Sequence, residues 1–195
     1  MSTNLELIKK IREKTGAGIV MVKKALEESK GDEKKAIEII RKKGQERAMK
    51  KSARSVKEGI IATYVHSNKK IGAIVELFCE TDFVAKNSEF QALGQDLAMQ
   101  IAATDPQYLK PEDVSEKEIE KEKEIWKEQL LNVGKNPAVI EKALEGKVKK
   151  FREEISLLSQ PFIKDNDLKV EDLIKEKIAK IGENIQIGKF ERFEL

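Results

Sequence analysis

Apolar residues at the start of the chain recur with the spacing of short amphipathic helices. A first helix, which Asn4 can cap, precedes a Thr-Gly-Ala-Gly break at residues 15–18. A second helix is expected over residues 19–31, and a third, capped by Asp32, is expected to end at Gly44. Residues 1–44 are therefore predicted to form a three-helix module.

The second of these helices has an apolar face and two further large apolar residues. At 3.6 residues per turn, one face collects four side chains, those of Ile19, Val22, Ala25 and Leu26. Val20 and Met21 point away from that face. They form either a small docking surface beside the Gly-Ala-Gly loop or a contact with a neighbouring helix or the linker, and the pattern leaves both interpretations open.

Residues 45–58 are polar and basic, which is typical of a linker, here expected to be helical, at a domain boundary. Eight Lys or Arg residues occur between Arg41 and Lys57. Such a run can contact nucleic acid or the ribosome. It contains no aromatic residue for base stacking, and Glu46 interrupts it, so the composition favours a solvated linker.

The period of the apolar pattern changes to two after Gly59. The segment 60–65 is rich in β-branched residues, and every odd position from Ile71 to Cys79 is apolar, which predicts a β-hairpin. A helix beginning near Ser88 follows. Its predicted buried stripe consists of Phe90, Leu93, Leu97 and Ile101.

The rest of the chain is predicted to be mainly helical. A charged helical hairpin, similar to an antiparallel coiled coil, is expected over about residues 112–160, with a tight turn at Gly134. A helix over 170–181 and a strand from Ile185 to Phe193 complete the pattern. The element order predicts an α+β fold with an antiparallel sheet, and residues 59–195 are expected to form its core domain.

Composition narrows the class of protein. Of 195 residues, 37% are charged and 39% are apolar, which suits a folded chain with a densely charged surface. One cysteine and one histidine exclude an internal disulfide and an ordinary zinc site. No apolar run is long enough to cross a membrane, and Met1 to Lys10 contain no signal core. A cytoplasmic protein without metal or cofactor is expected.

Residues with catalytic potential are few. Cys79 lies on the apolar side of its predicted strand and His66 lies at a turn, so a Cys-His pair is not expected. The Gly16-x-Gly18 pair lacks the preceding strand and the Lys-Ser/Thr pair of a phosphate loop. The pattern therefore does not predict an enzyme.

The connection Thr81-Asp82-Phe83-Val84 joins a buried strand to a buried helix. A charge and an aromatic ring leave the backbone together there, which is an unusual feature of a short connection. The pattern alone favours Phe83 as a core residue and Asp82 as the cap of a turn. The alternative is a contact with a partner.

Three stretches, taken together, resemble bacterial translation elongation factor Ts. They are REKTGAGIVMVKKAL at residues 12–26, ELFCETDFVAK at residues 76–86 and IGENI at residues 181–185. The resemblance spans essentially the whole chain and keeps the order of the motifs.

The resemblance implies a guanine-nucleotide exchange factor that binds elongation factor Tu in its GDP-bound and nucleotide-free forms. In that family the segment matching Thr81, Asp82, Phe83 and Val84 intrudes on the GTPase domain and disturbs its magnesium and phosphate contacts. The N-terminal module resembles a ubiquitin-associated domain, and the pair Ile19-Val20 matches its docking contact. The single core half resembles the short form of the family, which implies a homodimer.

This chain departs from the family pattern at several positions. Ile19 and Val20 are β-branched where methionines are frequent, Met21 stands where an acidic residue is common, and Phe78 replaces a small or polar residue. Two other functions remain open: an RNA- or ribosome-binding protein that uses the basic linker, and a ubiquitin-associated-like docking module on an unrelated core.

Overall fold

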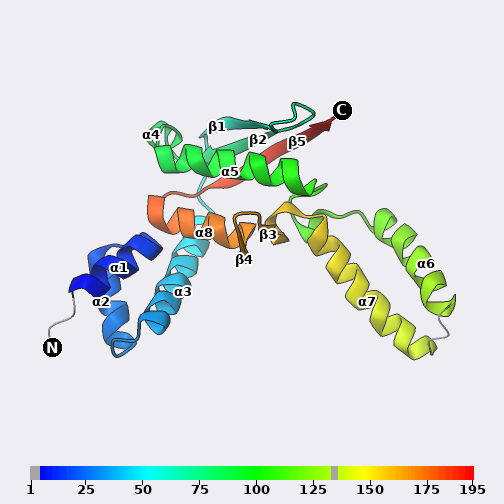
Figure 1. Ribbon diagram of the computed structural model, residues 1–195, viewed down its shortest axis with the longest axis horizontal. Coiled ribbons are helices and arrows are strands. Elements are labelled where there is room, and N and C mark those ends of the chain that lie inside the picture. The colour runs from blue at the N-terminus through cyan, green and yellow to red at the C-terminus, as the bar shows by residue number, and fades with distance from the viewer. Residues whose placement is uncertain (1–4, 133–135) are drawn as a thin grey trace. The chain divides into compact units, whose positions relative to one another are not determined.

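The computed structural model describes residues 5–132 and 136–195 (Figure 1). Helices and a small antiparallel sheet confirm the predicted α+β class. The described residues form two compact units. One contains the chain up to residue 62 with residues 75–95 and 172–189, and the other contains residues 63–74, 96–171 and 190–195. Asn4 and Gly134, the expected cap and turn, lie outside the described residues.

The N-terminal helices are α1 (Leu5–Thr15), α2 (Ile19–Glu28) and α3 (Glu33–Lys51). Asp32 caps α3, because its side chain accepts a hydrogen bond from the Lys35 backbone N–H at 3.0 Å. The three helices enclose a small apolar core. Its buried members are Ile8, Ile11, Val22, Ala25, Leu26, Ala36 and Ile40.

The prediction that Gly44 ends the third helix was wrong. The helix continues to Lys51, and Gly44 is buried within it. A Cβ added at Gly44 would lie 3.4 Å from the Cβ of Ala179 in α8 (Val170–Ile181). Glycine acts here as a point of close helix approach, so tertiary packing outweighs its low helix propensity. The first part of the expected basic linker is thus the end of α3.

The two faces of α2 also differ in part from the expectation. Val22, Ala25 and Leu26 are buried as predicted, but Ile19 at the start of the helix is 47% exposed. Met21, expected to point away from the core, packs against it. The extension of α3 adds a second contact, because Arg47 lies beyond Gly44 and its guanidinium comes within 3.7 Å of the Met21 sulfur.

The main sheet contains β1 (Glu58–Val65), β2 (Ile71–Cys79) and β5 (Gln186–Glu194) in the order β1-β2-β5. The predicted alternation in β2 is confirmed, because its odd positions from Ala73 to Cys79 are buried. Helix α5 (Ser88–Thr104) begins where expected, and its predicted apolar stripe is fully buried. Gly94 allows α5 to approach β1, since a Cβ there would lie 2.9 Å from the Ala62 Cβ.

The helical hairpin consists of α6 (Glu116–Asn132) and α7 (Pro137–Glu154), which lie side by side (Figure 1). Ser115 caps α6 by accepting a hydrogen bond from the Glu118 N–H at 3.3 Å. The rings of Trp126 and Phe151 meet edge to face across the hairpin, with centroids 5.6 Å apart. An antiparallel helix pair was therefore predicted correctly.

A second small sheet was not predicted. Strands β3 (Pro161–Phe162) and β4 (Asp165–Lys169) pair antiparallel after the short helix η2 (Leu157–Ser159), and another short helix, η1 (Pro111–Asp113), precedes α6. The buried amide of Gln100 holds this segment: it donates to the Pro161 carbonyl at 3.2 Å and accepts from the Ile163 N–H at 2.8 Å. Within the described residues, no helix combines the length and apolar character that crossing a membrane requires.

Two glycines in helices give opposite predictions. We expect Gly94→Ala to lower the free energy of unfolding by about 1–3 kcal/mol, because the new methyl overlaps fixed atoms of β1. Gly146 in α7 has open space around it, so Gly146→Ala should raise stability by up to about 1 kcal/mol through helix propensity alone. Urea unfolding followed by circular dichroism measures both. Stabilisation by Gly94→Ala would contradict the packing of α5 on β1.

Candidate functional site

The segment of residues 81–84, here called the signature loop, consists of Thr81 and the first three residues of a single helical turn, α4 (Asp82–Ala85). Thr81 has an extended backbone and is its N-cap, with the hydroxyl accepting from the Val84 N–H at 3.4 Å. This turn was not predicted, and the interpretation of Asp82 as the cap was wrong, because the neighbouring threonine takes that role. The cap sets the direction in which the next two side chains leave the chain.

Phe83 is 81% exposed. The interpretation of this ring as a core residue was therefore wrong, whereas Ala85, two residues later, is buried. Burying a phenylalanine side chain is worth about 1.5–3 kcal/mol, so a ring left in water on an ordered loop marks a surface that gains free energy when a partner covers it.

Asp82 forms an ion pair across α4. Lys86 Nζ lies 2.7 Å from Asp82 Oδ2, at the i,i+4 spacing of neighbours on a helix. The hydrogen bond from Lys86 lowers the pKa of Asp82 and reciprocally raises the pKa of Lys86. Both groups are therefore charged at neutral pH, and the signature loop presents a carboxylate beside an aromatic ring.

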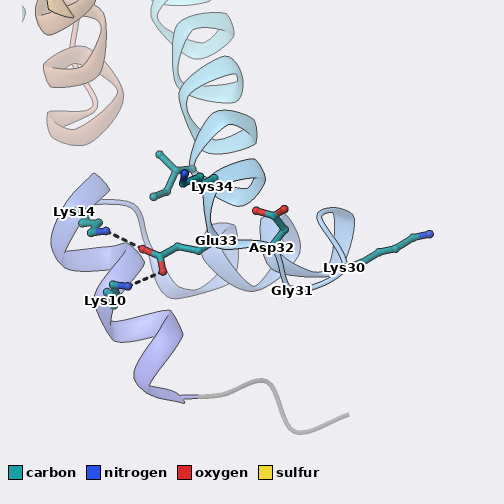
Figure 2. Close-up of a pocket in the computed structure, with 8 residues that line it drawn as sticks. Lys10, Lys14, Lys30, Gly31, Asp32, Glu33 and Lys34 are labelled. Carbon is teal, nitrogen blue, oxygen red and sulfur yellow. Dashed lines mark hydrogen bonds and ion pairs between the residues drawn. The ribbon is translucent and has the colours of Figure 1, made fainter. Parts of the chain in front are cut away.

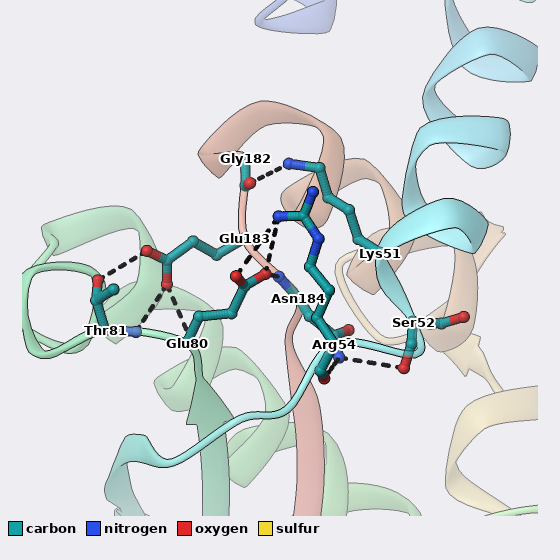
Figure 3. Close-up of polar contacts among 8 residues, drawn as sticks. All are labelled: Lys51, Ser52, Arg54, Glu80, Thr81, Gly182, Glu183 and Asn184. Carbon is teal, nitrogen blue, oxygen red and sulfur yellow. Dashed lines mark hydrogen bonds and ion pairs between the residues drawn. The ribbon is translucent and has the colours of Figure 1, made fainter.

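The carboxylate of Glu183 holds the start of the signature loop (Figure 3). Its Oε2 accepts from the backbone N–H groups of Glu80 at 3.1 Å and of Thr81 at 3.0 Å, and its Oε1 accepts from the Thr81 hydroxyl at 2.7 Å. Glu183 follows Gly182, whose φ of +93° is a left-handed conformation that favours glycine. The turn after α8 thus places a carboxylate against the end of β2.

A reciprocal bond fixes the two segments to each other. The Glu80 carboxylate accepts from the backbone N–H of Asn184 at 2.6 Å, and Arg54 lies 3.5 Å from both of its oxygens (Figure 3). Each segment therefore supplies a carboxylate to a backbone donor of the other. Hydrogen bonds to charged groups are among the stronger ones.

The end of α3 joins the same network. The buried Asn184 side chain donates to the carbonyls of Ser52 at 3.3 Å and Arg54 at 2.8 Å, and Lys51 Nζ donates to the Gly182 carbonyl. We call this set of contacts, made by residues 51–54, 80–81 and 182–184, the polar brace. The sequence indicated a turn and strand at 181–185 but did not indicate that its Glu and Asn hold the signature loop.

Ile19 and Val20 form a second exposed patch. They occupy the first turn of α2 and are 47% and 69% exposed. Gly16 before them has φ of +65°, and Gly18 is the N-cap. The loop therefore turns sharply and leaves two β-branched side chains at the end of a helix.

A hollow of about 690 Å³ lies elsewhere in the three-helix module, at the start of α3 (Figure 2). Four lysines line it, and the Glu33 carboxylate accepts hydrogen bonds from Lys10 at 2.7 Å and from Lys14 at 2.8 Å. These two bonds lower the pKa of Glu33. The hollow contains none of the predicted site residues.

The chemistry of the thiol does not suit nucleophilic catalysis. Cys79 is fully buried, and its Sγ donates to the Thr81 carbonyl at 3.2 Å. Burial, with the nearby Glu183 charge, raises the pKa of Cys79, so the reactive thiolate is disfavoured. His66 instead lies beside the Tyr64 hydroxyl, 3.2 Å from its oxygen.

Several cations of the basic segment are engaged within the protein. Arg41 pairs with Glu176 at 3.4 Å, Lys43 with Glu28 at 2.5 Å, and Lys51 and Arg54 belong to the polar brace. Part of the positive charge that suggested nucleic-acid binding is thus paired with carboxylates or carbonyls of the same chain.

The ion pair in α4 gives a prediction about pH. Lys86→Ala should raise the pKa of Asp82 toward its usual value near 3.8. Because folding depresses this pKa, the pair stabilises the fold above the unfolded pKa and the contribution is lost as pH falls through the folded pKa. Carboxyl NMR titration measures the shift. Lys164→Ala, which removes a similar pair with Asp96, is the control and should leave Asp82 unchanged.

Comparison with known proteins identifies the family. The family model described as "Elongation factor TS" matches residues 5–195. Elongation factor Ts of Thermodesulfovibrio yellowstonii is 55% identical over 195 residues, covering 100% of this chain and 97% of that protein. The protein of the same name from Thermosipho melanesiensis is 56% identical over 188 residues, with 96% of each chain covered. The one from Thermotoga neapolitana is 53% identical over 195 residues, covering 100% of this chain and 98% of the relative. The chain therefore belongs to the elongation factor Ts family of translation elongation factors.

Proposed function

We propose that this protein is a guanine-nucleotide exchange factor that binds elongation factor Tu with GDP and in its nucleotide-free form, and speeds the release of GDP. The observation that carries the proposal is Phe83, a ring 81% exposed on a loop held by charge-assisted hydrogen bonds. Family membership supports the same partner.

Exchange follows from thermodynamic linkage. A protein that binds the nucleotide-free partner more tightly than the GDP-bound partner must weaken GDP binding by the same factor. A nanomolar GDP complex corresponds to about 12 kcal/mol, so appreciable release requires a large coupling free energy. Contacts to phosphate and to its magnesium ion are the strong ones, which makes them the effective place to act.

The signature loop is the element that acts there. Phe83 inserts between helices of the partner, which move between discrete packed arrangements, and Asp82 accompanies it with a carboxylate. Thr81 directs the turn through its capping hydroxyl, and Val84, which donates its N–H to that hydroxyl, is half-buried. These residues displace the magnesium and phosphate contacts without chemistry of their own, so the protein acts as a binder and not as an enzyme.

The three-helix module supplies a second contact. Ile19 and Val20 offer an apolar pair at the end of α2, and we assign them to docking on the same partner. Docking by this pair contributes affinity for elongation factor Tu, while insertion of Phe83 distorts the nucleotide site of that partner. Residues 1–44 act as the docking module and residues 59–195 as the core domain, in the cytoplasm where translation elongation takes place.

The protein is further proposed to be a homodimer. Strand β1 lies at an edge of the sheet, and its Ile61 and Val65 are 66% and 63% exposed on one side. An apolar strand face at a sheet edge is a liability unless it is covered. A second copy of the chain covers it in this proposal.

The first prediction of the proposed function concerns Phe83→Ala. Since the ring is exposed, the variant should keep its free energy of unfolding within about 0.5 kcal/mol, whereas loss of a core phenylalanine costs about 3–5 kcal/mol. Release of fluorescent GDP from elongation factor Tu, followed by stopped flow, should slow by about tenfold or more, as for a hot-spot aromatic residue.

Phe193→Ala is the matched control, because this ring is 62% exposed on β5, outside the signature loop. It should release GDP at the normal rate while light scattering reports an unchanged mass. Normal release with Phe83→Ala, at full saturation of the partner, would exclude the signature loop as the exchange element.

The second prediction concerns the dimer. The double variant Ile61→Lys, Val65→Lys places two charges on the exposed side of β1 and should reduce the mass in solution to that of one chain. Val139→Lys adds a charge at a position of α7 that is 52% exposed and should leave the dimer intact. Multi-angle light scattering at micromolar concentration measures the mass of both variants. An unmodified chain that is monomeric in this measurement would refute the dimer.

A further inference from the structure

The signature loop has little apolar packing to orient it. Its helix α4 is one turn of four residues, too short to be stable alone, and among these residues only Ala85 is buried. Phe83 faces solvent and contributes no burial. The orientation of the loop must therefore come from polar contacts at its start, where the chain leaves β2.

We propose that Glu183 is the positioning residue of the signature loop, and that it acts on exchange through Phe83 and not by touching the partner itself. This inference rests on the proposed function. Glu183 is half-buried, and its carboxylate is occupied by the Glu80 and Thr81 donors. Both of its oxygens accept hydrogen bonds from donors at the start of the signature loop, which is the arrangement of a group that orients another group.

The path from Glu183 to the ring is short and continuous. One carboxylate oxygen accepts from two successive backbone N–H groups, which fixes the plane of the chain as it leaves the strand. The other oxygen accepts from the Thr81 hydroxyl, and that hydroxyl caps the turn by accepting from the Val84 N–H. The carboxylate thus sets the cap, and the cap sets the turn that carries Phe83.

Glu183 is itself held in place. The backbone N–H of the next residue, Asn184, donates to the Glu80 carboxylate at 2.6 Å, and the buried Asn184 amide donates to two carbonyls beyond α3. A group that orients a binding loop is effective when its own position is over-determined. The polar brace meets this condition from both neighbouring segments.

A preordered loop matters because ordering on binding costs conformational entropy. If Phe83 were carried on a mobile segment, part of the interaction with the partner would be used to order the loop instead of to distort the GTPase domain. Loss of the brace should therefore leave docking through Ile19 and Val20 intact and lower the maximal rate of GDP release.

The experiment measures fluorescent-GDP release from elongation factor Tu over a range of concentrations of this protein. Glu183→Ala should lower the plateau rate by about tenfold or more, as expected when a hot-spot aromatic side chain is misplaced, with a smaller change in the half-saturating concentration. Glu183→Gln keeps an acceptor for the two N–H groups and should restore most of the rate, leaving a deficit of about two- to threefold.

Combination with Phe83→Ala separates positioning from general stability. If Glu183 acts through the ring, Glu183→Ala should slow release no further in the Phe83→Ala background, although it destabilises the fold equally in both backgrounds. Glu118→Ala removes another carboxylate hydrogen bond, the 2.6 Å bond from the Tyr108 hydroxyl, and should leave the plateau unchanged. Thermal melts establish that every variant is folded at the assay temperature.

A normal plateau with folded Glu183→Ala, or effects that multiply in the double variant, would overturn the positioning role while leaving the proposed function intact. Failure of the unmodified protein to speed GDP release would instead overturn the proposed function. If Glu183→Ala does not fold, Glu183→Gln carries the test: its deficit must appear with Phe83 present and vanish in Phe83→Ala, and any other pattern overturns the inference.

Discussion

The hydrogen bonds from residues 80 and 81 to the Glu183 carboxylate join parts of the chain that are about a hundred positions apart. Around this contact the end of β2, the turn after α8 and the segment that follows α3 meet in one polar brace. Two of the stretches that resemble elongation factor Ts, one around Thr81 and one around Glu183, are therefore hydrogen-bonded to each other. A carboxylate suits this role because it accepts from several donors at once and adds charge to each bond.

The apolar packing of the same unit supports the brace by close approach of backbones. Gly44 lies where α3 meets α8, and Gly94 lets α5 lie close against β1, where a methyl group would press on the Ala62 Cβ. In the same unit, Phe90 and Leu93 of α5 are fully buried. The brace in turn orients the signature loop, in which Phe83 is exposed and Val84 is half-buried.

The proposed exchange activity depends on both the exposed ring and the polar bonds that order its loop. A side chain that inserts into another protein, as proposed for Phe83, must be apolar enough to enter it and ordered enough to disturb its packing. Burial of Phe83 within its own protein would order the loop, but the ring could then no longer contact a partner. The loop is ordered instead by polar bonds at its start, between residues 80–81 and Glu183. Asp82 and Lys86 add an exposed charged pair across the same turn.

Local patterns in the sequence determined much of the fold: the bounds of β2 and α8, the start of α5 and its buried stripe, and the Asp32 cap all follow from periodicity and capping within a few residues. Tertiary structure alone decided the rest. Gly44 lies inside a helix at its contact with α8, Met21 packs against the core of the three helices and contacts Arg47, and the buried Gln100 amide bonds to the segment that contains β3 and β4. The exposure of Phe83 and the role of Glu183 belong to this second group. Periodicity reports which side chains prefer water, whereas hydrogen bonds between distant segments depend on which residues the completed fold brings together.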